Sequence, residues 1–310
     1  MSTTPRARCW ECLIANGLHT ESITVDFDDV RRRSRQSLAA TPRAFLRWAG
    51  SKRAVLPQLV ELLPRTFRTY REPFLGGGSL FFLLQPQRAV ITDSCAELIQ
   101  TFEAVRDHPG RILQYIDPMK PDKRAFYAMR DQRSRGHIKR AAEFIYLNKT
   151  CWNGLYRVNA EGRFNVPYGA PKSDTIVDES NLRACSAALR EPGVELAIAQ
   201  FDSAMEGVAE GDLVFLDPPY VTRHNNNGFV DYNERLFSWE DQVKAAEVAM
   251  EAADAGAHVI VTNAYHDEVL DLYEGFDIQS LRRHSTLASA STARGPVREA
   301  ILWKPSPLAR

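Results

Sequence analysis

The residues best suited to carry chemistry are Asp217, Pro218, Pro219 and Tyr220, which follow the apolar run at 213–216. The run predicts a buried strand, so the acid, the prolines and the ring stand where that strand must end. Two successive prolines fix φ and remove two N–H donors, which turns their carbonyl oxygens outward beside an acid and a stacking ring. These groups predict a pocket for a flat molecule that carries an NH₂ group. An ordinary strand-ending Pro-Pro turn is the alternative, which the flanking Asp and Tyr disfavour.

A second group of residues predicts a bound nucleoside cofactor. Gly76, Gly77 and Gly78 separate a strand that ends near Phe74 from an apolar helix, and glycine lets a backbone approach a cofactor closely. The next predicted strand delivers Asp93 at its carboxyl end, the usual position of an acid that holds ribose hydroxyls. The spacing matches neither the GxGxxG fingerprint nor a P-loop.

Trp48 and Lys52 lie in or beside a turn that contains Gly50. A ring and a cation at this place could both face one small ligand. A core tryptophan with a surface lysine is the alternative, and these two residues alone favour it.

Composition indicates a cytoplasmic globular protein without a membrane segment. The 310 residues are 44% hydrophobic and 25% charged, no apolar run reaches the length of a membrane span, and the polar N-terminus lacks a signal peptide. Five scattered cysteines fit a reducing compartment. The CxxC of Cys9 and Cys12 lacks a second pair at zinc spacing, so no metal site is predicted.

Charge is unevenly distributed although the net charge is zero. Residues 120–172 contain twelve Lys or Arg and four Asp or Glu, an excess of eight positive charges. Such a segment is typical of a phosphate-facing surface, and a solvated basic helix face explains it equally well. The arginine-rich run at 31–35 could also contact nucleic acid, but a solvated tail is favoured.

Strands and helices alternate along most of the chain, which predicts an α/β fold with a doubly wound, mostly parallel sheet and a terminal antiparallel hairpin. Residues 113–193 interrupt the alternation with helices at 122–133 and 138–147 and hairpin-like excursions. We therefore expect an N-terminal extension at 1–43, partly disordered and helical near 28–38, a catalytic domain at 44–112 and 194–310, and an inserted, mainly helical domain. The other predicted elements are helices at 55–63, 96–107, 239–255 and 266–273, strands at 88–92, 194–199, 213–216 and 258–262, and a hairpin of 276–282 with 297–303.

Taken in order, four segments resemble the Dam-type DNA adenine-N6 methyltransferases, the D12 class, over residues 44–305. The segments are 45–52, 73–79, 153–157 and the Asp-Pro-Pro-Tyr motif at 217–220. The resemblance implies a Rossmann-like methyltransferase sheet, S-adenosylmethionine as cofactor and double-stranded DNA as substrate. It also makes 113–193 the target-recognition domain. We expect a monomer or a weak dimer on DNA, with a restriction endonuclease as a candidate partner.

The resemblance also implies roles for individual residues. The residues expected to bind the cofactor are Trp48, Lys52, Phe74, Gly76, Gly77, Gly78, Asp93 and Asp217. The residues expected to contact DNA, frequently at GAT-containing sequences in this family, are Arg47, Lys149, Trp152, Asn153, Leu155, Arg157 and Arg163. Among these, Trp152 and Leu155 are candidate wedges between bases. Ser51 and Trp152 replace the glycine and tyrosine usual in the family, which leaves the recognition sequence open.

The predicted reaction methylates the N6 of an adenine flipped out of the duplex and stacked on Tyr220. Asp217 and the Pro218 carbonyl would accept its two hydrogens and stabilise the growing positive charge. Cytosine N4 or a glutamine amide is an alternative acceptor, although Asp at 217 favours adenine. A non-catalytic DNA-binding regulator is the remaining alternative, which the intact Asp217, Tyr220, Asp93 and glycine turn disfavour.

Overall fold

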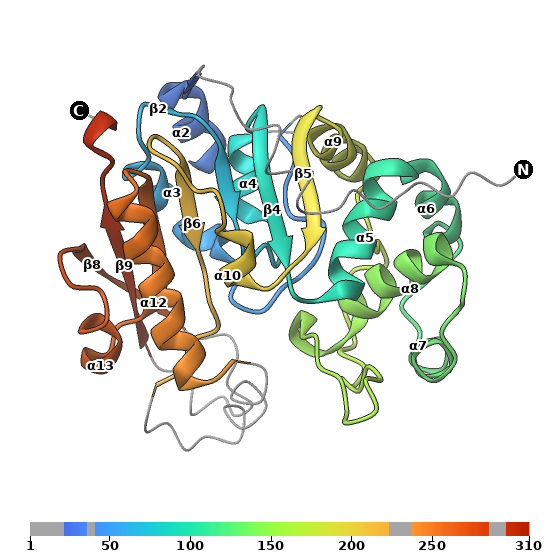
Figure 1. The fold of residues 1–310 in the computed structure, drawn as a ribbon. Helices are drawn as coiled ribbons and strands as arrows, with labels where there is room; N and C mark the ends of the chain where they lie inside the picture. The colour runs from blue at the N-terminus through green and yellow to red at the C-terminus, as the bar shows by residue number, and fades with distance from the viewer. Residues whose placement is uncertain (1–21, 36–40, 223–236, 285–295, 310) are drawn as a thin grey trace, which may run out of the picture.

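The computed structural model describes residues 22–35, 41–222, 237–284 and 296–309. One sheet of seven strands, in the order β5-β4-β3-β6-β7-β9-β8, forms its centre (Figure 1). The first five strands of this order are parallel, whereas β9 is antiparallel to both β7 and β8. The predicted doubly wound sheet with a terminal hairpin is therefore confirmed. The strands are β3 Tyr70–Glu72, β4 Arg88–Asp93, β5 Gly193–Ile198, β6 Leu213–Leu216, β7 His258–Ala264, β8 Asp277–His284 and β9 Pro296–Lys304.

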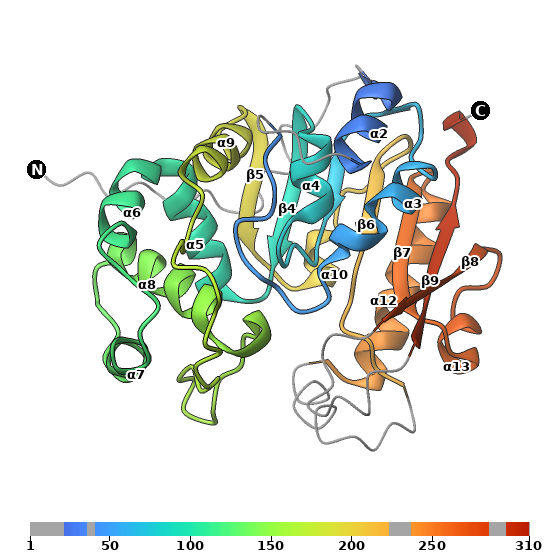
Figure 2. The same ribbon diagram turned by 180° about the vertical axis from the view of Figure 1, so that it is seen from behind.

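Helices cover both faces of the sheet. In Figure 1 α10 and α12 lie in front of it, and Figure 2 shows α2, α3 and α4 on the opposite face. A further group of helices, α5 to α9, extends the molecule beyond the β5 edge. The helices are α2 Phe27–Arg35, η1 Lys52–Val55, α3 Leu56–Val60, α4 Ser79–Leu84, α5 Ala96–Asp107, α6 Pro109–Ile116, α7 Lys123–Asp131, α8 His137–Thr150, η2 Trp152–Gly154, α9 Glu179–Leu189, α10 Phe201–Ala204, α12 Trp239–Asp254, α13 Asp267–Leu270 and η4 Pro307–Ala309.

The central strand β6 explains how the layers are held together. All four of its residues are buried, with Leu213 and Phe215 in the core on one face and Val214 and Leu216 in the core on the other. Alternate residues of a strand point to opposite faces, so an unbroken apolar run suits a strand covered on both sides. Each such side chain contributes about 1.5–3 kcal/mol by burial. The strand is thus a rigid support for the residues that follow it.

Residues 22–35 of the N-terminal segment are part of this fold. Strand β1, Ile23–Thr24, pairs with β2, Thr66–Phe67, and the following helix α2 buries Val30 in the core. The predicted helix near 28–38 is confirmed as α2 up to Arg35, and residues 36–38 lie outside the described residues. Cys9 and Cys12 lie outside the described residues.

The inserted segment shares one hydrophobic core with the sheet. Phe126, Phe144 and Leu182 belong to the same buried cluster as Phe102 of α5 and Phe215 of β6. The predicted division between residues 112 and 113 falls inside α6. The extent of a separate recognition domain stays a prediction.

The predicted hairpin-like excursion follows α8. Antiparallel bridges join Cys151 to Tyr168 and Val158 to Phe164, and the Asn165 N–H donates to the Arg157 carbonyl at 3.0 Å. The excursion projects past the end of the sheet at which β4 and β5 finish (Figure 1).

Most predicted helices have their expected positions, with shifted ends. Asp122 caps α7 by accepting the Ala125 N–H at 2.7 Å, and Ser238 and Asp241 form a capping box that begins α12. The helix predicted at 55–63 ends at Val60, because the chain tightens into turns before Pro64. Among the described residues, no helix has both the length and the apolar character needed to cross a membrane.

Candidate active site

Three parallel strands deliver the candidate residues to one edge of the sheet. Strand β3 lies between β4 and β6, and the connections on its two sides run over opposite faces of the sheet. Ligands of doubly wound sheets bind at the carboxyl ends of the strands beside such a switch point. The glycine turn follows β3, Asp93 ends β4 and Asp217 follows β6. The predicted cofactor residues and the predicted catalytic residues therefore meet at one rim.

Asp217 is held by two side chains from distant parts of the sequence. Lys52 Nζ lies 2.6 Å from Asp217 Oδ1, and Thr262 Oγ1 donates to the same oxygen at 2.7 Å. Thr262 lies on β7, the neighbour of β6, and sequence reasoning assigned it no functional role. The signal that could have found it is its place near the carboxyl end of the adjacent strand. Both of these contacts fall on the same carboxylate oxygen, Oδ1, and fix its position.

Lys52 is a buried cation, only 4% exposed, rather than a surface lysine. Its Nζ also donates to the Gly50 carbonyl at 2.6 Å and lies 5.0 Å from the centre of the Tyr220 ring. A buried ammonium requires compensating charge and hydrogen bonds, which Asp217 and Gly50 supply. The structure thus joins the predicted residues Lys52, Asp217 and Tyr220 in one cluster. It rejects the alternative that Lys52 is merely exposed.

The glycine turn is shaped by close contacts and left-handed backbone. Gly76 and Gly78 have φ of 48° and 64°, and a Cβ on Gly76 would lie 2.8 Å from Trp48 Cδ1. Such a side chain would have to displace the indole, so glycine is required there. Trp48 itself stacks on Tyr156, with ring centroids 5.6 Å apart and an interplanar angle of 19°. Trp48 therefore connects the turn to the inserted segment.

Asp93 is tied to this turn through the backbone. Its two carboxylate oxygens accept the N–H groups of Gly76 and Cys95, each at 2.9 Å. Burial raises the pKa of the Asp93 carboxyl, and the two N–H donors oppose that shift. The carboxylate is thereby oriented at the rim. Each of its oxygens can still accept a further hydrogen bond.

An aromatic cluster completes the rim. Phe74, predicted to bind the cofactor, stacks on Phe201 with centroids 5.2 Å apart, and Phe237 lies edge-on at 5.8 Å. Phe201 begins the helix after β5 and was not singled out from the sequence. Its position after the carboxyl end of β5 is the signal that could have found it.

Beneath the rim, Tyr70 and Glu72 form a buried pair that was also missed. The Tyr70 hydroxyl donates to Glu72 Oε2 at 2.9 Å. Burial raises the pKa of Glu72 well above its usual value, Tyr70 opposes this, and the charges of Asp217 and Asp93 add to the rise. This shift favours the protonated form of Glu72 relative to that of an exposed glutamate.

The predicted base reader Arg47 docks on the inserted segment. Its N–H donates to Asn148 Oδ1 at 2.8 Å, and Asn148 Nδ2 donates to the Arg47 carbonyl at 2.6 Å. A Cβ on Gly154 would lie 2.3 Å from Arg47 Cβ, so only glycine fits against this chain. Asn148, about a hundred positions away in sequence, is a positioning residue that sequence reasoning missed.

The other predicted DNA contacts have differing surroundings. Trp152 is half-buried and Asn153 is exposed, whereas Leu155 is only 7% exposed and packs in the core. As the chain lies here, Leu155 contributes packing and cannot act as a wedge without moving. Arg157 Nε donates to Asn165 Oδ1 at 2.7 Å, and the exposed Arg163 lies 3.6 Å from Glu161. Their contacts with DNA stay predictions.

The sheet and its rim define an α/β methyltransferase with a Rossmann-like fold. A family model described as D12 class N6 adenine-specific DNA methyltransferase matches residues 48–287. The chain belongs to this family and is an adenine-N6-specific DNA methyltransferase.

Individual relatives agree with this assignment. The chain is 33% identical over 268 residues to the type II methyltransferase M1.LlaDCHI of Lactococcus lactis subsp. cremoris, covering 84% of this chain and 94% of that protein. It is 34% identical over 263 residues to the type II methyltransferase M.MjaIII of Methanocaldococcus jannaschii, covering 77% and 90%. The DNA adenine methylase of Escherichia coli is 28% identical over 275 residues, covering 85% and 96%.

Proposed function

We propose that this methyltransferase uses S-adenosylmethionine to methylate adenine N6 in duplex DNA, in the cytoplasm, at a site that contains GAT. The observation that carries the proposal is the position of Asp217. It follows the central strand β6 and is held by Lys52 and Thr262. Strand β3, which leads into the glycine turn, lies next to β6, and β4, which ends at Asp93, lies next to β3.

The rim suits a nucleoside with a charged tail. The Gly76 to Gly78 turn permits close approach, the oriented carboxylate of Asp93 can accept ribose hydroxyl hydrogens, and Phe74 offers a ring for stacking. Trp48 supports the turn from behind. S-adenosylmethionine supplies a sulfonium-bound methyl group that a nucleophile can take.

Asp217 and Pro218 make adenine N6 a better nucleophile. The N6 lone pair is delocalised into the ring, so the amine must become tetrahedral to react. Both described contacts of Asp217 fall on Oδ1, which leaves Oδ2 to accept one N6 hydrogen while the Pro218 carbonyl accepts the other. These acceptors stabilise the positive charge that grows on nitrogen. Tyr220, held beside Lys52, would stack on the extruded base.

Product analysis tests the reaction directly. The purified protein is incubated with S-adenosylmethionine and unmethylated plasmid, and the DNA is digested to nucleosides for mass analysis. N6-methyladenine is expected. N4-methylcytosine would show that Asp217 serves another planar amine, and absence of both products would contradict the proposal.

Site mapping tests the recognition sequence and the partner. Two of the relatives carry the name type II methyltransferase, which supports a restriction endonuclease as partner of this enzyme. Single-molecule mapping of methyladenine in DNA from expressing cells is expected to show one GAT-containing sequence. Cleavage of unmethylated DNA at that sequence, in extracts of the source cells, would reveal the endonuclease.

Sedimentation with and without duplex DNA tests the proposed monomer or weak dimer.

A further inference from the structure

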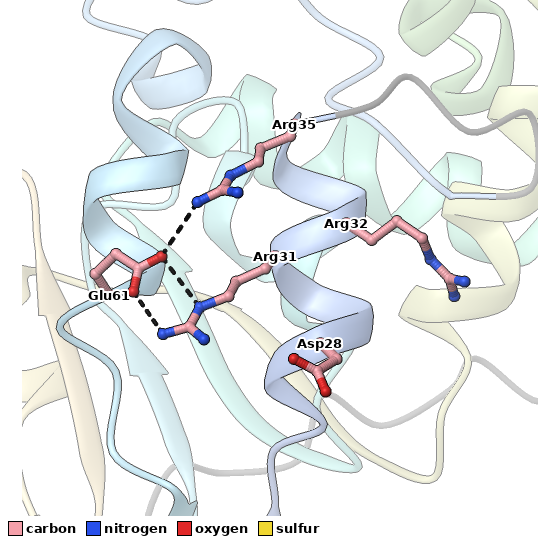
Figure 3. A pocket seen from close by; sticks show the side chains of 5 residues that line it. All are labelled: Asp28, Arg31, Arg32, Arg35 and Glu61. Carbon is pink, nitrogen blue, oxygen red and sulfur yellow. Dashed lines mark hydrogen bonds and ion pairs between the residues drawn. The ribbon is translucent and has the colours of Figure 1, made fainter.

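The N-terminal helix α2 is anchored firmly on the catalytic fold. Arg31 donates to both carboxylate oxygens of Glu61, at 3.0 and 2.5 Å, and Arg35 lies 3.6 Å from the same group. Figure 3 shows Arg31 and Arg35 converging on Glu61, whereas Arg32 points away. On another side of the helix, Arg33 donates to the Leu83 carbonyl at 2.8 Å. These contacts place further basic groups of α2 beside α4.

A cavity of about 570 Å³ lies between α2, the 41–56 segment and the end of α8. It is strongly basic, because six of the described residues that line it are cationic and none of those described is an acid. The cationic residues are Arg33, Arg35, Arg43, Arg47, Arg53 and Lys149. Three different parts of the chain contribute them.

Among the residues that the structure describes, three of these cations have no anionic partner. Arg43 is paired with Asp178, Arg33 with Asp29 and Arg35 with Glu61. Within the part of the chain that the structure describes, no ion pair or side-chain hydrogen bond is made by Arg47, Arg53 or Lys149.

The pKa of Lys149 responds to this unbalanced positive charge. Burial lowers its pKa to about 8, and the positive charges of Arg47, Arg53 and Arg43 add to that effect, with Cys185 opposing it. Cations gathered without counter-charge repel one another, and a bound anion would relieve that repulsion. Guanidinium groups match the geometry of phosphate oxygens through paired N–H donors.

The cavity adjoins the active site and the recognition segment. Lys52 faces Asp217, whereas Arg47 and Arg53, on either side of it in sequence, line the cavity together with Ser51. Asn153, a predicted DNA contact, lines it as well. An anion here would therefore lie close to the predicted base-reading residues without occupying the rim.

We propose that this cavity binds a phosphate group, supplied by the backbone of duplex DNA, and that α2 completes the site. The proposal rests on the proposed DNA methyltransferase function and extends it by one sequence-independent contact. Free nucleotides or pyrophosphate carry the same chemistry and are the alternative source.

Salt-dependent DNA binding tests the DNA source. Arg53→Gln and Lys149→Gln are each expected to weaken binding of any duplex roughly tenfold, equally for all sequences. Each should also lower the slope of log Kd against log salt by about one. Arg35→Gln is expected to act in the same direction, more weakly. Arg111→Gln, which removes an exposed arginine on α6, is the matched control and should change neither quantity.

A melting-temperature series with inorganic pyrophosphate tests the alternative source. Stabilisation by pyrophosphate in the wild type but not in Arg53→Gln, with unchanged salt slopes, would overturn DNA as the ligand. Unchanged slopes without such stabilisation would overturn the site itself.

Lys149→Arg should preserve binding if charge is what matters. Circular dichroism confirms folding of each variant. All binding is measured without cofactor, so a wild type that binds DNA but transfers no methyl group would contradict only the proposed function.

Discussion

The rim around Asp217 and the inserted segment differ in how their side chains are held. At the rim, Asp217 is fixed by Lys52 at 2.6 Å and by Thr262 at 2.7 Å, and all three emerge from or pack on the central sheet. In the inserted segment, Arg157 has one described side-chain partner, Asn165, and the exposed Arg163 pairs with Glu161 at 3.6 Å. The rim side chains are thus held by partners from distant parts of the sequence, whereas Arg157 and Arg163 are held by partners within the inserted segment.

If the function proposed above is correct, this difference separates the chemistry from the choice of DNA sequence. A methyl transfer step needs acceptors held within a narrow geometry before the substrate arrives. A recognition surface needs cations and amides that can adjust to base edges and phosphates. Substitutions at the rim should therefore change the rate for every sequence, and substitutions in the insertion should change which sequences react.

The largest effect is expected from Asp217→Ala. Removing the acceptor that stabilises charge on N6 should reduce kcat by about a thousandfold or more, by analogy with loss of a preorganised transition-state contact. DNA affinity should persist, because the carboxylate contributes little to holding the duplex. Single-turnover methylation and fluorescence anisotropy measure the two quantities. Normal methylation by this variant would place the catalytic site elsewhere.

The sheet that supports the rim should also weaken in acid through His258. Its Nε2 donates to the Leu62 carbonyl at 2.8 Å, and burial lowers its pKa from about 6.5 to about 4. The unfolded chain therefore binds a proton first as pH falls, so stability decreases between pH 6.5 and 4 and levels off below. The loss is about 3 kcal/mol.

Urea unfolding at pH 7 and pH 4.5 measures this effect. His258→Gln should start less stable at pH 7 and lose less on acidification than the wild type. An equal loss in both proteins would show that other groups control the acid transition.

Arg157→Ala should act on sequence choice. If Arg157 reads a base, its loss costs about 1–3 kcal/mol and relaxes specificity at one position. Methylation of a randomised duplex library, read by sequencing, identifies that position. Uniform weakening over the whole library would instead make Arg157 a phosphate contact.

The smallest effects are expected from two matched substitutions, each of which removes a hydrogen bond that orients a functional side chain. Thr262→Val removes the hydrogen bond to Asp217 and should lower kcat about tenfold, with sequence preference unchanged. Asn165→Ala frees Arg157 and should lower discrimination between sites about as much, with kcat at the best site unchanged. The same library assay and single-turnover rates compare them. If both variants changed rate and preference together, the rim and the insertion would form one unit.

Much of the site could be predicted because its parts are local in sequence. The Asp217 to Tyr220 motif follows a buried strand directly, and the glycine turn joins its own strand and helix. Patterns of this kind depend on neighbouring residues, whose spacing the sequence shows. The basic excess in 120–172 is equally visible from composition.

The partners of these motifs could not be predicted, because they come from distant segments. Lys52 and Thr262 meet at Asp217 only when η1, β6 and β7 are in place. Leu155 was predicted as a wedge, but it is buried in the core. An apolar side chain suits a core position as well as a wedge, so its residue type alone does not distinguish the two.

The sequence by itself determined the fold class, and it located the Asp217 motif, the glycine turn and Asp93, because each depends on the pattern of adjacent residues. The tertiary structure decided that Lys52 is buried against Asp217 and that Asn148 holds Arg47. It also placed α2 beside Lys149 to enclose a basic cavity. These are contacts between residues far apart in the chain, and only the packing of the helices on the sheet brings them within bonding distance.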